Sequence, residues 1–238
     1  MKLHILAFAA HPDDVELASS GTLLRHKAEG KNIGIVDLTR GELGTRGTPE
    51  LRAVESAKAS ELLQLDYRAN LGLADGFFTK NENSLKAIIQ QLRHTQPDVV
   101  LANAISDRHI DHGRAADLVA DACFLSGLRK IETEFEGKRQ EPWRPKAVYH
   151  YIQDRYIHPS LVVDITPYWE LKMAAIKAYS SQFYNENSTE PQTPISSAEF
   201  IEFLEARARE MGRIIGVTYG EGFTTQRAVG VSDLTSLS

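Results

Sequence analysis

The chain has 238 residues, of which 42% are hydrophobic, and this length and composition suit one large α/β domain with a sizeable buried core. Its formal net charge of -5 comes without the clustered Lys and Arg of a nucleic-acid-binding surface, so we expect no nucleic-acid partner. The single cysteine, Cys123, excludes an intrachain disulfide framework and is typical of a reducing compartment.

The N-terminal half alternates short apolar runs with helical patterns. Its first run, residues 3–10, predicts a buried strand, and acids follow too soon for an export signal. No run approaches the ~20 apolar residues of a membrane span, so we expect a cytoplasmic protein with no membrane partner. The further strands expected in this half are 32–39, 67–71 and 97–104, and the expected helices are 19–31, 49–65, 84–96 and 114–128.

The second half is less regular, with a polar loop at 134–145 and a long exposed loop at 185–197. We find no internal repeat or low-complexity linker, so we expect a single domain over 1–238. In that domain, 1–128 would be a βα core that carries the motifs, and 129–238 would complete it. The elements expected in the second half are strands at 146–152 and 160–166 and helices near 167–180 and 197–213.

The strand–helix rhythm of residues 1–128 predicts a Rossmann-like, mostly parallel sheet with helices on both faces. In such sheets, ligands bind beyond the carboxyl ends of the strands. Three polar loops follow strands here, at 11–16, 40–48 and 105–113. We therefore expect these loops to meet at one edge of the sheet.

Two of these loops concentrate imidazoles and carboxylates. The first supplies His11, Asp13 and Asp14, and the third supplies His109 and His112. Two imidazoles and a carboxylate are a plausible ligand set for a catalytic zinc ion with an open fourth position. The pattern leaves open which of Asp13 and Asp14 is the metal ligand and which is the general base. It also leaves open which of His109 and His112 is a ligand and which acts as an acid or stabilises the oxyanion. Taken singly, each residue has a simpler explanation as a surface polar group, a helix cap or a solvated turn.

The loop at 40–48 offers a rival interpretation. Gly41, Gly44 and Gly47 lie between a strand and a helix and resemble a phosphate cradle. Their spacing is neither that of the dinucleotide fingerprint nor that of a P-loop, so a nucleotide-binding module is the distant alternative. A flexible loop beside an active site is the other interpretation, with Arg46 and Arg52 gripping a polar substrate. Arg52 alone is equally well explained as a solvated helix residue.

The motifs "AHPDD" and "HIDH" together resemble those of the LmbE-like, or PIG-L, zinc-dependent de-N-acetylases. Further stretches, among them "DLTRGELGTRGT", "NLGLADGFF" and "WRPKAVYHYIQ", are similar to the branch of that family that deacetylates N-acetyl-glucosaminyl malate in bacillithiol biosynthesis. The resemblance covers about residues 1–227. It implies a Rossmann-like fold and hydrolysis of an acetamide with release of acetate and a free amine.

The resemblance also implies roles for single residues. His11, Asp14 and His112 would bind Zn²⁺, or another divalent metal such as Fe²⁺. Asp13 would be the general base that draws a proton from the metal-bound water. His109 would steady the tetrahedral oxyanion or protonate the leaving amine.

Three more residues receive roles in the same way. Asp111 would orient or charge His109. Arg52 looks like the sugar-contacting arginine of the family, and Arg108 would suit the malate carboxylate because a guanidinium pairs bidentately with carboxylates. The implied partners are a small amino-sugar substrate and further copies of the chain in a homo-oligomer. A deacetylase of another N-acetyl sugar or of bacillithiol conjugates, and a scaffold with a vestigial site, remain alternatives.

Overall fold

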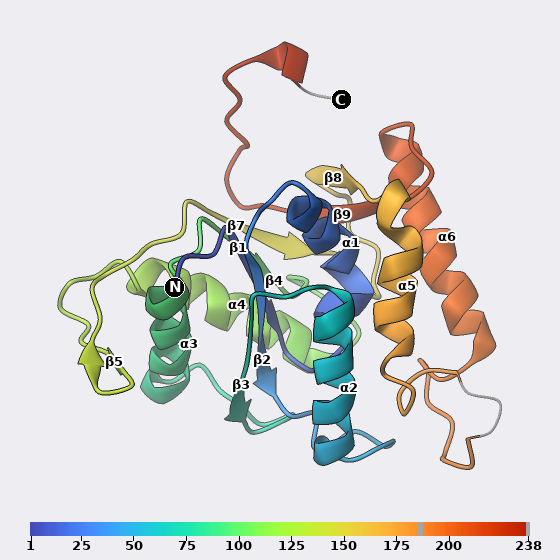
Figure 1. Ribbon diagram of the computed structural model, residues 1–238, viewed down its shortest axis with the longest axis horizontal. Helices are drawn as coiled ribbons and strands as arrows, with labels where there is room; N and C mark the ends of the chain where they lie inside the picture. Colours follow the sequence, from blue (N-terminus) through green and yellow to red (C-terminus); the bar gives the residue numbers. More distant parts are fainter. Residues whose placement is uncertain (185–187, 237–238) are drawn as a thin grey trace.

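A seven-stranded sheet organises the chain, with helices packed on both of its faces (Figure 1). The computed structural model describes residues 1–184 and 188–236. The strands of the sheet are β1 (Ile5–Ala9), β2 (Ile33–Thr39), β3 (Tyr67–Leu73), β4 (Val99–Ala102), β7 (Ala147–Tyr151), β8 (Leu161–Asp164) and β9 (Gly220–Thr224). The helices are α1 (Asp14–Ala28), α2 (Pro49–Leu62), α3 (Glu82–Thr95), α4 (Ile110–Leu125), α5 (Trp169–Lys177) and α6 (Ala198–Ile214), with short 3-10 turns at η1 (Thr166–Tyr168) and η2 (Leu234–Ser236).

The strand order in the sheet is β3-β2-β1-β4-β7-β9-β8. The first five of these strands run parallel, whereas β9 pairs antiparallel with both β7 and β8. The expected fold class, a mostly parallel sheet between two layers of helices, is confirmed. The chain reverses its direction of sheet growth between β1 and β4, which is where ligands bind in open α/β sheets.

The central strands are apolar because both faces of the sheet are covered. β1 and β2 are buried at every position. Helices α3 and α4 cover one face, and α1, α2, α5 and α6 cover the other (Figure 1). Strands buried on both faces read as continuous hydrophobic runs, which is why the sequence pattern located them.

Two helices begin earlier than predicted, and both carry site residues. Helix α1 begins at Asp14 rather than at Ser19, and α4 begins at Ile110 rather than at 114. Acidic side chains in the first turn of each helix are favoured by the positive end of the helix dipole. The two motifs therefore span the starts of two helices: Asp14, Asp111 and His112 lie in first turns, whereas His11, Asp13 and His109 precede them.

Other elements were missed. A short hairpin of β5 (Glu134–Phe135) and β6 (Lys138–Arg139) lies within the expected loop at 134–145. Strand β9 escaped prediction because its sequence, "GEGFT", shows no apolar alternation. Its Gly220 is needed for packing, since a Cβ there would lie 2.8 Å from the backbone nitrogen of Gly212 in α6.

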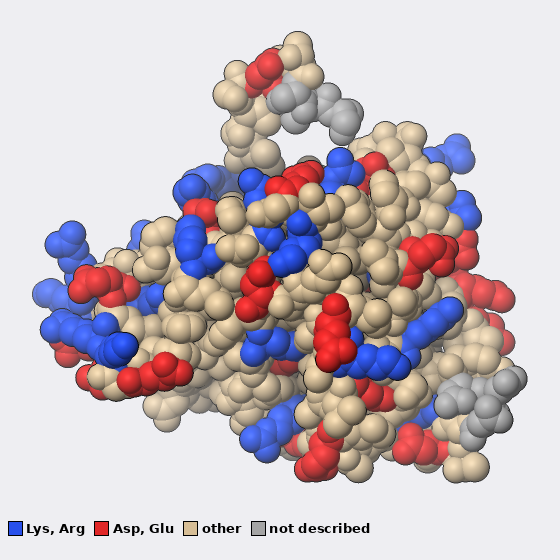
Figure 2. Space-filling view, in the orientation of Figure 1, with Lys and Arg blue, Asp and Glu red and all other residues tan. Residues whose placement is uncertain are grey.

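The surface carries charges of both signs. Lys and Arg are interspersed with Asp and Glu over the face in view (Figure 2). After β9 the described chain runs outward, away from the sheet and its helices (Figure 1). Among residues 1–184 and 188–236, no helix is long and apolar enough to cross a membrane.

Candidate active site

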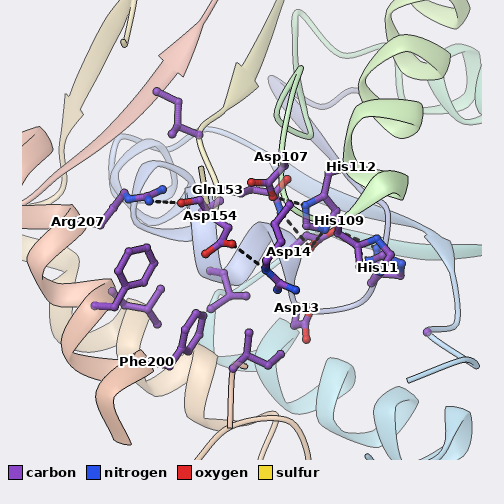
Figure 3. A pocket seen from close by; sticks show the side chains of 18 of the residues that line it. His11, Asp13, Asp14, Asp107, His109, His112, Gln153, Asp154, Phe200 and Arg207 are labelled. Atoms are coloured by element: carbon purple, nitrogen blue, oxygen red, sulfur yellow. Dashed lines mark hydrogen bonds and ion pairs between the residues drawn. The ribbon is translucent and has the colours of Figure 1, made fainter. Parts of the chain in front are cut away.

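A cavity of about 350 Å³ opens where β1 and β4 end (Figure 3). The two predicted clusters both line it, so the expectation that their segments meet at one sheet edge is confirmed. It is also lined by residues of the Gly-rich loop, of the segment after β7 and of helix α6. Seven of the eight predicted site residues line the cavity. The eighth, Asp111, lies behind His11.

Asp13 occupies a conformation that is unusual for a residue with a side chain. As the N-cap of α1 it has φ 119° and ψ -23°, in the region that favours glycine. Its carboxylate is buried, and its Oδ2 lies 3.6 Å from Nη1 of Arg52. Burial raises the pKa of Asp13 to about 7, against the opposing charge of Arg52.

Asp14 sits among hydrogen-bond donors. Its Oδ2 accepts from the His11 backbone N–H at 3.0 Å and from the Asn103 amide at 2.9 Å. Its Oδ1 accepts from the Gln153 amide at 3.0 Å and lies 3.1 Å from Nε2 of His112. Burial alone would raise the pKa of Asp14, but the charge and hydrogen bond of His112 outweigh it and hold the pKa well below its usual range.

The ring of His11 is held between acids. Its Nε2 is 3.0 Å from an oxygen of Asp75 and 3.5 Å from one of Asp111, while Nδ1 faces Asp14 at 3.7 Å. Burial would lower the pKa of His11, but hydrogen bonds to Asp111 and Asp75 and the charge of Asp14 raise it to about 10. In this structure the ring therefore favours its charged form.

His112 has the same arrangement on the other side of Asp14. Its Nδ1 is 2.5 Å from Oδ2 of Asp107, which leaves Nε2 turned toward Asp14. Burial would lower the pKa of His112, but the charge of Asp14 and the hydrogen bonds to Asp107 and Asp14 raise it to about 9.

This donor set fits a divalent metal. Two imidazoles present one nitrogen each to opposite oxygens of Asp14, and their other nitrogens are fixed by carboxylates, as is usual for metal-binding histidines. The described groups whose potential ligand atoms all lie within 4.8 Å of one another are His11 with His109 and His112, and His11 with Asp75 and Asp111. Asp14 is in neither group; the two imidazoles beside it face different oxygens of its carboxylate.

His109 packs against both of the other imidazoles. Its ring centre is 4.6 Å from that of His11 and 5.2 Å from that of His112. As the N-cap of α4, its Nδ1 accepts the backbone N–H of Asp111 at 3.2 Å. Burial lowers the pKa of His109, and the charges of His11 and His112 lower it further. The ring is therefore neutral near pH 7.

Asp111 differs in part from the expectation. Its carboxylate accepts the Gly76 N–H at 2.7 Å and contacts Arg114 at 3.1 Å, beside the ring of His11. Its charge acts on His109 and favours protonation of that ring. The hydrogen bond that orients His109, however, comes from the backbone N–H of Asp111 and not from its carboxylate.

Arg52 lines the cavity and is buried, which excludes the alternative of a solvated helix residue. Its Nη1 donates to the Pro12 carbonyl at 3.0 Å, and its Nη2 donates to the side chain of Gln182. The buried Nε has no hydrogen-bond partner among the described residues. Gly41 makes room for this guanidinium, since a Cβ there would lie 2.8 Å from Nη1. This close approach of Arg52 explains why residue 41 is a glycine, one of the three that suggested a phosphate-binding loop.

Arg46, by contrast, does not line the cavity. It is buried, and its guanidinium contacts Ser188 and Glu190. These residues belong to the loop predicted at 185–197, whose described part from residue 188 packs onto the Gly-rich loop. Residues 185–187 of that prediction lie outside the described residues.

Arg108 reaches the cavity rim, with about half of its side chain exposed. Its Nε donates to Oδ2 of Asp154 at 2.8 Å. The guanidinium is therefore placed beside the cavity, already next to one carboxylate.

Glu16, in the first turn of α1, is fully buried below the site. Its Oε1 accepts from Arg68 at 2.6 Å and from the Tyr179 hydroxyl at 2.9 Å. Arg68 in turn forms two hydrogen bonds with Asp37 of β2. The network ties the first turn of α1 to β2, β3 and the end of α5.

Sequence reasoning missed other residues of the site. Asp75, which follows the end of β3, belongs to the quoted stretch "NLGLADGFF", and its place after a strand was an available signal. Asn103 and Gln153 also follow strands, but amides carry no comparable pattern. Helix α6 adds a wall that no spacing indicated, made by Phe200, Phe203, Leu204, Arg207, Ala208 and Met211.

Comparisons with known proteins agree with this geometry. The family model described as PIG-L, GlcNAc-PI de-N-acetylase, matches residues 6–123. The crystal structure of the conserved protein TT1542 from Thermus thermophilus superposes with a TM-score of 0.85, at 39% identity over 98% of each chain.

Several relatives have a deacetylase activity in their descriptions. Diacetylchitobiose deacetylase from Thermococcus kodakarensis is 27% identical over 92% of this chain and 81% of its own length. A Bacillus anthracis protein described as probable N-acetyl-alpha-D-glucosaminyl L-malate deacetylase 2 is 27% identical over 76% of this chain and 81% of its own length. Fold, site and relatives together define the class as deacetylases, hydrolases that act on amide bonds. The chain belongs to the PIG-L, or LmbE-like, family, as its two motifs predicted.

Proposed function

We propose that this protein removes the acetyl group from an N-acetyl-glucosaminyl compound, and that its substrate is N-acetyl-alpha-D-glucosaminyl L-malate. One observation carries the proposal: a buried carboxylate, Asp13, adjoins the cluster of His11, Asp14 and His112 in a single cavity. The choice of the malate glycoside draws on the Bacillus anthracis relative and on the basic side chains at the cavity rim.

In this proposal His11, Asp14 and His112 hold Zn²⁺ or another divalent metal such as Fe²⁺. The ion would act as a Lewis acid toward the acetyl carbonyl and would lower the pKa of a water molecule. Asp13 accepts the proton of the attacking water. Its pKa of about 7 suits a base that works near neutral pH.

His109 acts on the other side of the amide. Its neutral ring, with Nδ1 accepting from the backbone, presents Nε2–H to the oxygen that gains charge as the carbonyl is attacked. The alternative is that a protonated His109 delivers a proton to the leaving amine, and its Nδ1 would then no longer accept the backbone N–H of Asp111. The backbone N–H of Asp111 supports the neutral ring, and the charge of its carboxylate supports the protonated one.

The two arginines bind substrate in this proposal. Arg52 has a buried Nε donor without a partner among the described residues, and a sugar hydroxyl would satisfy it. Arg108, at the rim, offers its remaining N–H groups to a carboxylate of malate. A cytoplasmic location and assembly into a homo-oligomer stay predictions.

Acetate release tests the proposal. The purified protein is incubated with the malate glycoside, with diacetylchitobiose and with free N-acetylglucosamine, each with and without a chelator. We expect release from the malate glycoside to be fastest, to stop with the chelator and to return on adding Zn²⁺ or Fe²⁺. Faster release from another sugar would retain the class and reject the malate substrate, and no release from any of them would reject the activity.

A further inference from the structure

Helix α6 brings a guanidinium into the cavity that neither motif includes. Arg207 lines the cavity beside Asp154, opposite the cluster of histidines (Figure 3). Its Nη2 donates to the backbone carbonyl of Asp154, and its Cζ lies 4.8 Å from the ring centre of Phe203. These two contacts fix the plane of the guanidinium.

One nitrogen of Arg207 remains without a partner. Its Nη1 is buried and makes no hydrogen bond with any described residue. Buried donors in native proteins are nearly always paired, so an acceptor from a bound ligand is expected at this position.

The charges nearby favour an anionic acceptor. Arg108 donates to the Asp154 carboxylate and Arg207 to the Asp154 backbone carbonyl, so a single carboxylate lies near two guanidinium groups. Of the other acids that act on Arg207, Asp107 is paired with His112, and Glu210 is exposed to solvent. This part of the cavity therefore retains a positive charge.

The neighbouring wall is apolar. Leu204 and Phe200 lie on α6 about one and two turns before Arg207 and line the same cavity. A ligand that fits both features carries an anionic group on a short aliphatic chain.

We propose that Arg207, together with Arg108, forms a carboxylate-binding subsite, and that Arg207 determines specificity for glycosides whose aglycone is a short aliphatic acid. This inference rests on the proposed function and names the part of the molecule that would recognise the acid. Two N–H donors of a guanidinium match the two oxygens of a carboxylate, and the apolar wall of α6 packs on its carbon chain.

A pair of matched substrates tests the subsite: N-acetylglucosaminyl malate and its neutral dimethyl ester. Arg207→Met should raise KM for the malate glycoside by roughly 10- to 100-fold, the worth of a charged hydrogen bond, and leave kcat little changed. KM for the diester should change by less than about twofold, because no charge is recognised there. Arg213→Met, an exposed change on the same helix, is the matched control and should leave both values as in the unchanged protein.

Equal effects of Arg207→Met on the two substrates would overturn the inference, because a purely structural role affects both alike. Should that variant fail to fold, Arg207→Lys keeps a charge and a long stem, and it should still raise KM for the malate glycoside alone.

A direct binding measurement separates this inference from the proposed function. If the unchanged protein releases acetate from neither substrate, the proposed function fails. Calorimetric titration with glucosaminyl malate then decides the subsite. A loss of affinity of about tenfold or more in Arg207→Met supports it, and unchanged affinity overturns it.

Discussion

Asp13 combines a buried charge with a strained backbone. The carboxylates of the two adjacent acids diverge: Asp13 faces Arg52, and Asp14 faces His112. The φ of 119° belongs to Asp13, and no sequence rule places a non-glycine residue there. Such strain is retained where function requires it.

Two substitutions at this position separate backbone strain from chemistry. Both Asp13→Gly and Asp13→Ala remove the carboxylate, but only glycine adopts the observed φ without cost. We expect Asp13→Gly to be more stable than Asp13→Ala by about 1 kcal/mol, measured by urea unfolding. Equal stabilities would show that Asp13 carries no backbone strain.

Asp75 shows where sequence reasoning stops at the residue scale. The clusters of His11 and His112 were recognisable because residues of the right types lie close together in sequence. Asp75 reaches His11 only through the fold, from the segment after β3. The role of Arg207 could not be predicted for the same reason, since in the sequence it is one of several charged residues on an amphipathic helix.

Removing the charge of Asp75 tests its support of His11. Asp75→Asn should weaken zinc binding by roughly 10- to 100-fold, because the outer nitrogen of a metal-binding histidine is then poorly held. A competition titration with a chromophoric chelator measures this affinity. Asp98→Asn, at the opposite end of β4, is the control, and an equal effect of both changes would contradict the role of Asp75.

At the scale of elements, helix α1 depends on contacts from far along the chain. The Glu221 carboxylate accepts the backbone N–H groups of Gly21 and Thr22, and Lys172 donates to the carbonyl of Leu17. Glu221 and Lys172 form a buried ion pair at 2.7 Å. This ion pair therefore contacts two backbone donors and one backbone acceptor in the middle of α1 and supports that part of the helix.

Breaking this ion pair should destabilise the protein strongly. Lys172→Met leaves the charge of the buried Glu221 without its counter-ion and should lower the free energy of unfolding by about 3–5 kcal/mol. Urea denaturation measures the loss. Glu205→Gln, which breaks the exposed pair with Arg209, should have little effect, and a similarly small effect of Lys172→Met would refute the support of α1.

At the scale of the whole molecule, the sheet was predictable because its central strands are continuous apolar runs between helical patterns. The order of strands brings β1 beside β4, and this adjacency places the two motifs together. The edge formed by β8 and β9 was not fully predictable, since β9 is held by tight packing against α6 rather than by apolar alternation. The fold also explains why α6 contributes a cavity wall that its sequence does not indicate.

The charges of the cluster link metal binding, folding and pH. In the absence of metal, the pKa values of about 10 for His11 and about 9 for His112 exceed their unfolded value of about 6.5. Both rings therefore stabilise the metal-free fold below pH 6.5 or so, and this stabilisation is lost as pH rises through about 9 to 10.

Metal binding requires neutral imidazoles, so it competes with these protons. At pH 7 we expect binding of Zn²⁺ to release about two protons and its affinity to rise with pH. Calorimetry in two buffers with different enthalpies of ionisation counts the protons. A heat of binding that does not depend on the buffer would contradict the assignment of both rings as ligands.

The central claim is that His11, Asp14 and His112 hold the metal while Asp13 remains free to move a proton. Metal content per chain, measured together with acetate release on the same preparations of Asp13→Ala and His112→Ala, tests it most directly. We predict that Asp13→Ala keeps its metal while turnover falls by roughly 10² to 10⁴, and that His112→Ala loses the metal. Loss of metal from Asp13→Ala, or full turnover in that variant, would contradict the account.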